Sequence, residues 1–302
     1  MASSFPVDAD ASGTVRRRRS PAKTNLRLKV TSRRPDGYHE LETLFIPLQC
    51  PADVVTIDFA ARQNGIATAS DDPTLPVNAA NIAGKAAAAY CRTAGITPSM
   101  AIFIHKEIPV AAGLGGGSAN AATVLLLLQE YYRALNGEQL AELAVTLGAD
   151  VPFFLHSRPA VATGIGEKFT PATFDPTRLP LLIAAPDFPV SAAWAYRHLN
   201  PSAIGPAPGM TAMLAAIAAA DWKRVGALLC NDLAAALYEK FPLLVHLRQE
   251  LLTAGALGAE ISGSGPSMLA IFADRAGAAA AATAIQTAFE GKIRTFVAMG
   301  ET

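Results

Sequence analysis

The sequence predicts an α+β protein of two domains, on three observations. The chain has 302 residues, 51% of them hydrophobic, which is enough for two domains with buried cores. Two strand-like segments flank a turn near the N-terminus, and a glycine-rich stretch leads into an apolar helix in the middle. Strands and helices follow in the order β–α–β–β–α–β toward the C-terminus, which is the ferredoxin-like order.

The first ordered elements are predicted to form a β-hairpin. Residues 24–31 alternate, with Leu26 and Leu28 on the apolar side and Asn25 and Arg27 on the polar side. The turn residues at 35–37 follow, and residues 41–48 then form a second strand.

Helices dominate the middle of the chain. We expect one over residues 81–90 that stops at Gly95, a strand over residues 100–109, and a helix over residues 118–135 that Gly137 ends. Another helix is expected over residues 138–148. Asp150 then stands in N-cap position before a short helix with Pro152 in its first turn.

The second half predicts a strand over residues 181–186, several helices up to residue 252 and two strands around a Gly-Ser-Gly turn within residues 259–272. A helix over residues 276–289 and a last strand over residues 293–299 complete it. The turn-rich segment over residues 157–178 suggests the domain boundary, which we place between residues 165 and 166.

The charge balance argues against some partners. The 25 Lys and Arg residues offset 25 Asp and Glu residues, so we expect neither nucleic acid nor a membrane as a partner. Cys50, Cys91 and Cys230 lack the spacing of a zinc site or a disulfide framework. They favour a reducing compartment, which we take to be the cytoplasm.

Residues 1–20 are predicted to be a disordered tail. They contain no apolar segment of a secretory signal, and Arg16, Arg17, Arg18 and Arg19 form a run of like charge. The alternative is that these arginines form a nucleic-acid or targeting patch.

Four glycines stand directly before the long helix, at residues 113 and 115–117. A strand, a glycine-rich loop and a helix N-terminus together form an anion site, because the free N–H groups and the helix dipole point at the ligand. No lysine follows Gly117, which excludes a P-loop. Ser118 replaces the third glycine of a dinucleotide-binding loop, and no second strand with an acidic end follows. A helix-start turn without a ligand is the remaining alternative.

Three segments together resemble a known family. Residues 109–122, "PVAAGLGGGSANAA", resemble the signature of the GHMP kinases, which are named for galactose, homoserine, mevalonate and phosphomevalonate. "PAKTNLRL" and "ISGSGPSMLAIF" resemble the N-terminal and C-terminal motifs of that family. The resemblance implies a ribosomal-protein-S5-like, ATP-binding α/β domain over residues 21–165 and a ferredoxin-like domain over residues 166–302. Thr24, Val110, Ala111 and Ala119 depart from the usual residues.

The resemblance also implies roles for individual residues. Asp150 is the base that takes the proton of the substrate hydroxyl, and Lys23 orients that hydroxyl and offsets charge on the transferred phosphoryl group. The ATP contacts are Asn81, Lys106, Pro109, Val110, Ala111, Ala112, Gly113, Leu114, Gly115, Gly116, Gly117, Ser118 and Ala119. The substrate contacts are Asn25, Tyr38, His39, Tyr196, Gly263, Ser264 and Gly265, with Tyr38 and Tyr196 stacking on the two faces of a cytosine.

The implied activity is ATP-dependent phosphorylation of an alcohol. Residues 21–45 closely resemble the branch of the family whose substrate carries a cytidine diphosphate and serves non-mevalonate isoprenoid synthesis. A homoserine- or mevalonate-type alcohol, a dehydrogenase and a non-catalytic nucleotide-binding module are the alternatives. Mg²⁺ is expected to arrive with ATP, and no protein-bound metal is expected, because His105 and His156 have no partner at ligand spacing. We expect a monomer or a weak homodimer.

Overall fold

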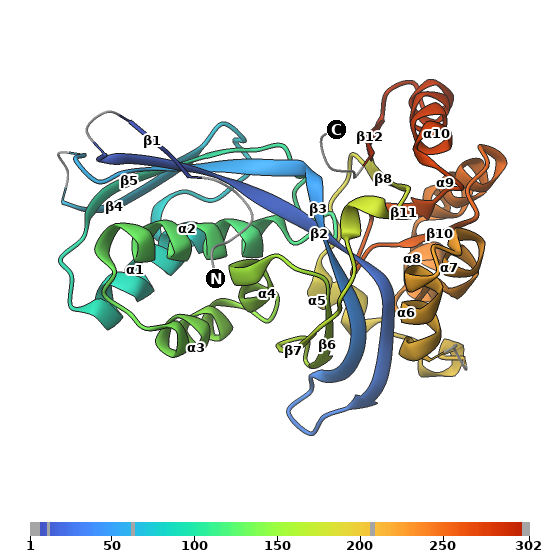
Figure 1. Cartoon of the computed structure of the whole chain (residues 1–302), viewed down its shortest axis with the longest axis horizontal. Helices are drawn as coiled ribbons and strands as arrows, with labels where there is room; N and C mark the ends of the chain where they lie inside the picture. The colour runs from blue at the N-terminus through green and yellow to red at the C-terminus, as the bar shows by residue number, and fades with distance from the viewer. Residues whose placement is uncertain (1–6, 11–12, 62–63, 206–208, 298–302) are drawn as a thin grey trace. The chain divides into compact units, whose positions relative to one another are not determined.

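The computed structural model describes residues 7–10, 13–61, 64–205 and 209–297 (Figure 1). Its contacts divide into two units that are both discontinuous in sequence. The first comprises Met1–Ala22, Ala52–Ile108 and Gly115–Arg158, and the second comprises Lys23–Pro51, Pro109–Leu114 and Pro159–Thr302. The sequence predicted two consecutive domains instead. The division differs because of two long strands, β2 (Val15–Arg33, 19 residues) and β3 (His39–Asp58, 20 residues). One part of each strand belongs to the first unit and the other part to the second.

The first unit is a sheet with helices along one side (Figure 1). Its strands follow the order β1-β2-β3-β5-β4, with β1 at Val7–Ala9, β4 at Gly65–Ser70 and β5 at Ser99–His105. Val55, Ile57, Ile102 and Ile104 lie on one face of this sheet and are at most 2% exposed. The helices are α1 (Ile82–Ala94), α2 (Gly116–Tyr132), α3 (Gly137–Leu147) and α4 (Val151–His156), preceded by the 3-10 turn Asn78–Ala80.

The structure confirms one predicted helix end and corrects another. Gly95 terminates α1 in the left-handed conformation, as expected. Gly137 does not end α2, which already stops at Tyr132; it is instead the first residue of α3. The cause is a capping box: the Asn136 side chain accepts from the N–H of Gln139, and the Gln139 side chain accepts from the N–H of Asn136. This capping box starts a helix at Gly137.

The structure corrects the predicted disordered tail for residues 7–9 and 15–20, which are strands, whereas residues 1–6 and 11–12 lie outside the described residues. Residues 15–20 belong to β2, and residues 16–18 pair with β1, where Val7 lies opposite Arg18. Arg16 and Arg18 both bind the carboxylate of Glu130 in α2, at 3.5 and 3.1 Å, whereas Arg17 is exposed. The run of like charge is therefore an alternating strand that covers α2 with every second arginine.

Deletion of residues 1–20 is expected to destabilise the protein, because it removes β1, the first part of β2 and the buried Ser20 from the first unit. We expect the melting temperature to fall by about 10 °C or more. Circular dichroism on heating measures this, with Arg17→Ala as the control that removes only an exposed side chain. Equal melting of the deletion variant and the full chain would show that this strand contributes no stability.

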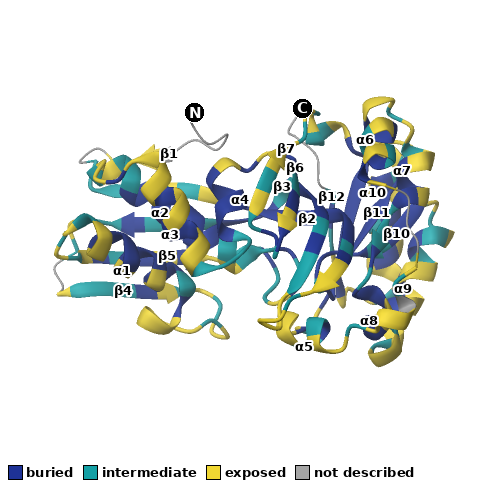
Figure 2. Cartoon of the chain, turned by 90° about the horizontal axis from the view of Figure 1, so that it is seen from below, coloured by how far each residue is buried: buried dark blue, intermediate teal, exposed yellow. Residues whose placement is uncertain are grey.

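The second unit contains the ferredoxin-like element that the sequence predicts. Its four-stranded antiparallel sheet has the order β10-β11-β8-β12, formed by β8 (Leu181–Pro186), β10 (Gly258–Ile261), β11 (Met268–Ile271) and β12 (Ile293–Val297). Strand β11 is buried along its length (Figure 2). The helices are α5 (Ala192–Arg197), α6 (Met210–Ala218), α7 (Trp222–Leu228), α8 (Ala234–Lys240), α9 (Pro242–Thr253) and α10 (Arg275–Ala288).

The predicted hairpin is confirmed, and residues 23–28 of its first strand are buried on both faces. Leu28 and Val30 join the core of this unit, as the alternation predicts. On the polar side, Lys23, Asn25 and Arg27 are only 4–5% exposed. Strand β9 (Cys230–Asn231) pairs with β2 here, and β6 (Ala160–Gly164), which pairs with β7 (Lys168–Pro171), covers β3.

Candidate active site

In the first unit, the glycine stretch begins helix α2. Gly115 is the N-cap residue and has φ +72°, a conformation that favours glycine. Gly116 and Gly117 then form the first turn, where the backbone N–H groups have no partner within the helix. A 17-residue helix that begins with two residues lacking side chains can receive an anion close to its backbone.

A lysine lies beside this helix start. A Cβ placed on Gly116 would lie 3.3 Å from Nζ of Lys106 and 3.0 Å from Ile108, so the ammonium group reaches the first residue of α2. Lys106 forms an ion pair with the fully buried Asp53, whose other oxygen accepts from the N–H groups of Glu107 and Ile108. The sequence reasoning missed Asp53; its only signal is a carboxylate with the apolar neighbours Ala52 and Val54.

Asn81 and Asp150 are both N-cap residues, in different ways. The Asn81 side chain accepts from the N–H of Ala83 and donates to the carbonyl of Pro76, so it holds the start of α1. Its contact with a nucleoside stays a prediction. Asp150 occupies the N-cap position of α4 as expected, but its side chain makes no capping hydrogen bond. The start of α4 therefore does not depend on the Asp150 carboxylate, and Pro152 in the first turn supplies a preset φ.

The second unit fixes Lys23 against the carbonyl end of the glycine stretch. Nζ of Lys23 donates to Oδ1 of Asn25 at 2.8 Å and to the carbonyl of Gly113 at 3.1 Å, and it lies 5.2 Å from the centre of the Phe45 ring. The Lys23 backbone N–H also donates to the carbonyl of Leu114 at 2.9 Å. The ammonium group and the backbone N–H of Lys23 are therefore both fixed to the segment that precedes α2.

The Gly263-Ser264-Gly265 turn lies close to the same Lys23 ammonium group. A Cβ on Gly263 would lie 3.0 Å from Nζ of Lys23 and 3.2 Å from Oδ1 of Asn25. Asn231, which sequence reasoning also missed, donates to the carbonyl oxygens of Ile261 and Gly263 at 2.8 and 2.7 Å. The second unit thus brings together Lys23, Asn25, Gly113 and Gly263.

The predicted base-binding residues Tyr38, His39 and Tyr196 all belong to the second unit. Tyr38 is 61% exposed at the tip of the hairpin. His39 stacks on Tyr196, with ring centres 5.7 Å apart and planes at 22°. Burial, and then the charge of Arg33, lower the pKa of His39, so its ring is neutral at pH 7 and presents one nitrogen as an acceptor.

The other predicted ATP contacts in the loop stay predictions, and the structure gives their burial and backbone bonds. The carbonyl of Ala111 accepts from Val190, and that of Ala112 accepts from Ser267. Leu114 and Ala119 are buried, at 1% and 0% exposure, whereas Pro109, Val110 and Ser118 are half-buried. Ala119 packs inside α2, so no hydroxyl stands at that position.

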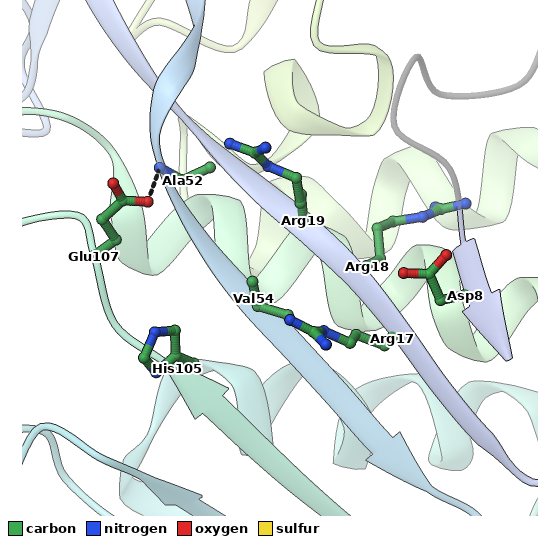
Figure 3. A pocket seen from close by; sticks show the side chains of 8 residues that line it. All are labelled: Asp8, Arg17, Arg18, Arg19, Ala52, Val54, His105 and Glu107. Atoms are coloured by element: carbon green, nitrogen blue, oxygen red, sulfur yellow. Dashed lines mark hydrogen bonds between the residues drawn. The ribbon is translucent and has the colours of Figure 1, made fainter. Parts of the chain in front are cut away.

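A separate pocket in the first unit contains none of the predicted site residues. It is lined by Asp8, Arg17, Arg18, Arg19, Ala52, Val54, His105 and Glu107 (Figure 3). Of its lining residues, Arg18 binds Glu130 and His105 binds Asp71. Within the described ranges, no three His, Cys, Asp or Glu side chains gather as a metal site, and no helix is both long and apolar enough to cross a membrane.

Comparison with known proteins gives matches along the chain. Residues 81–158 match the model of the GHMP kinases N terminal domain, and residues 213–291 match that of the GHMP kinases C terminal domain. The chain is 42% identical over 258 residues to a 4-diphosphocytidyl-2-C-methyl-D-erythritol kinase of Symbiobacterium thermophilum, covering 84% of this chain and 89% of the relative. It is 41% identical over 268 residues to a kinase of the same name from Geobacter metallireducens, covering 88% and 92%.

Solved structures agree with these matches. A crystal structure of 4-(cytidine 5'-diphospho)-2C-methyl-D-erythritol kinase is 36% identical, with a TM-score of 0.79 over 93% of this chain and 97% of that one. Homoserine kinase from Cytophaga hutchinsonii is 19% identical, with a TM-score of 0.74 over 96% of each chain, and this likeness shows the fold alone.

Proposed function

The chain belongs to the family of 4-diphosphocytidyl-2-C-methyl-D-erythritol kinases, and on that premise we propose that it phosphorylates the 2-hydroxyl of 4-diphosphocytidyl-2-C-methyl-D-erythritol with ATP. This is a step in the non-mevalonate synthesis of isoprenoid precursors. The observation that carries the proposal is the Lys23 ammonium group, buried and held against the Gly113 carbonyl of the family's phosphate-binding loop.

The reaction needs a base, an electrostatic partner and a phosphate cradle. Asp150 takes the proton of the hydroxyl, whose oxygen then bonds to the γ-phosphorus of ATP while the bond to the bridging oxygen breaks and ADP leaves. Lys23 orients the hydroxyl and offsets the charge on the transferred group. The N–H groups at the start of α2 receive the phosphates of ATP, and Lys106, which the family resemblance places near the purine, lies beside that helix start.

Mg²⁺ accompanies ATP in this proposal and screens the phosphate charge. Such an ion would be held mostly by phosphate oxygens and water. We place the reaction in the cytoplasm, since the spacing of Cys50, Cys91 and Cys230 favours a reducing compartment.

The cytidine end of the substrate would meet Tyr38, His39 and Tyr196. The exposed Tyr38 ring supplies a stacking face, and the neutral His39, backed by Tyr196, supplies a hydrogen-bond partner for the base. The Gly263-Ser264-Gly265 turn lies beside Lys23 and would border the diphosphate. A homoserine- or mevalonate-type alcohol would use none of these pyrimidine contacts.

A phosphotransfer assay tests the proposal. The purified chain receives ATP, Mg²⁺ and either 4-diphosphocytidyl-2-C-methyl-D-erythritol, the same alcohol without the cytidine diphosphate, homoserine or mevalonate. We expect ADP release only with the cytidine-linked alcohol. Turnover of homoserine or mevalonate at a comparable rate would replace the proposed substrate, and ATP binding without any transfer would leave a nucleotide-binding module.

Gly116→Val is expected to raise the KM for ATP by about tenfold or more. The new β-carbon would stand 3.0 Å from Ile108 and 3.3 Å from the Lys106 ammonium group, so it displaces the cation and fills the space at the helix start. The matched control is Gly137→Val, which changes the first residue of α3, where nothing lies within 4 Å. Unchanged ATP affinity in a folded Gly116→Val variant would rule out this loop as the phosphate cradle.

A further inference from the structure

A chain of hydrogen bonds runs from Lys23 into the interior of the second unit. Nζ of Lys23 donates to Oδ1 of Asn25, Nδ2 of Asn25 donates to Oγ1 of Thr43 at 2.7 Å, and Oγ1 of Thr43 donates to the carbonyl of Arg27 at 2.7 Å. Thr43 lies on β3 and is 1% exposed, so it cannot touch a substrate from this position.

Which group donates and which accepts in this series of hydrogen bonds follows from its buried end. The carbonyl of Arg27 can only accept, so Thr43 gives its one hydroxyl proton to that carbonyl and its oxygen must accept. The NH₂ group of Asn25 is the donor that fills this place, which turns Oδ1 of Asn25 toward Lys23. With the opposite orientation, the NH₂ group would face the ammonium group and repel it.

We propose that Thr43 is a positioning residue for phosphoryl transfer, which fixes the Asn25 amide so that its oxygen holds the Lys23 ammonium group against the Gly113 carbonyl. The proposal rests on the proposed function, in which Lys23 acts on the hydroxyl and the phosphoryl group. Removal of the Thr43 hydroxyl leaves the buried NH₂ group of Asn25 without its acceptor, and both rotation of the amide and its displacement loosen Lys23.

The test compares Thr43→Val, which keeps the shape, with Thr43→Ser, which keeps the hydroxyl. We expect Thr43→Val to lower kcat roughly ten- to hundredfold, the scale of one hydrogen bond to a charged group, with the KM for ATP within about twofold of the parent. Thr43→Ser should retain kcat within about threefold. The matched control is Thr68→Val on β4, because Thr68 is also buried but its hydroxyl has no hydrogen-bond partner.

A second measurement does not depend on turnover. The ¹H–¹⁵N signal of the Lys23 ammonium group, assigned by its loss in Lys23→Arg, reports how firmly the group is held. We expect its exchange with water to be about tenfold faster in Thr43→Val and restored in Thr43→Ser. The proposal requires both results. It is overturned if Thr43→Val leaves kcat unchanged, if it leaves the exchange rate unchanged, or if Thr43→Ser fails to restore either quantity. Absence of phosphotransfer in the parent, with the exchange result intact, would refute the proposed function and leave the positioning of Lys23 standing.

Discussion

Asp150→Asn should lower kcat by about 10²- to 10⁴-fold, while folding and ATP affinity stay unchanged. Asparagine has nearly the same shape but cannot accept the hydroxyl proton. Since the Asp150 side chain makes no capping hydrogen bond to α4, the helix start loses nothing. Phosphate electrostatics and positioning remain, so a residual rate is expected. Turnover at saturating ATP and substrate, a nucleotide-binding isotherm and a melting curve measure the three quantities.

Asp221→Ala is the matched control for this prediction. Asp221 also stands at a helix N-cap, but its side chain does accept from the N–H of Arg224, so its loss should cost about 1 kcal/mol of stability and leave kcat intact. Parent-like turnover of Asp150→Asn would reduce Asp150 to a residue of the α4 start. A loss of ATP affinity would instead assign it to the nucleotide site.

Gly113→Ala is expected to destabilise the second unit by about 3 kcal/mol or more. A Cβ at this position would lie 2.1 Å from the carbonyl oxygen of Ser262 and 2.7 Å from the backbone nitrogen of Gly265, so one of the two glycine segments must move. Such a shift also disturbs the Gly113 carbonyl that holds Lys23, and turnover should fall with stability. Chemical denaturation and the phosphotransfer assay measure the two effects.

The backbone conformation of Gly113 contributes separately, and Gly255→Ala isolates that contribution. Gly113 and Gly255 have φ values of +80° and +95°, but nothing lies within 4 Å of a Cβ on Gly255. Gly255→Ala should therefore cost only about 1 kcal/mol, from the strained φ alone. Equal losses in the two variants would show that φ, rather than the contact with the Gly263-Ser264-Gly265 turn, requires glycine at residue 113.

Local chemistry accounts for much of what the sequence predicted. Alternation along residues 24–31, the stop at Gly95 and the order of strands in the ferredoxin-like element all appear in the structure, because they depend on neighbours in the chain. Gly137 begins α3 instead of ending α2, because Asn136 caps α3. This effect is also local, but the prediction treated the glycine only as a helix stop. The roles of Lys23 and Asp150 follow from family motifs and await the assays above.

By itself, the sequence determined the types of the elements, the glycine loop before a helix and the family, since each is written in contiguous residues. Only the tertiary structure decided that the arginines at residues 16–19 lie in a strand over α2, that Lys23 is buried, and that Asp53 binds Lys106, Asn231 binds the Gly263 carbonyl and Thr43 binds Asn25. The physical reason is that these roles arise from partners that are distant in the chain. A buried threonine on a strand looks the same in sequence whether its hydroxyl is idle, as at Thr68, or orients an amide, as at Thr43.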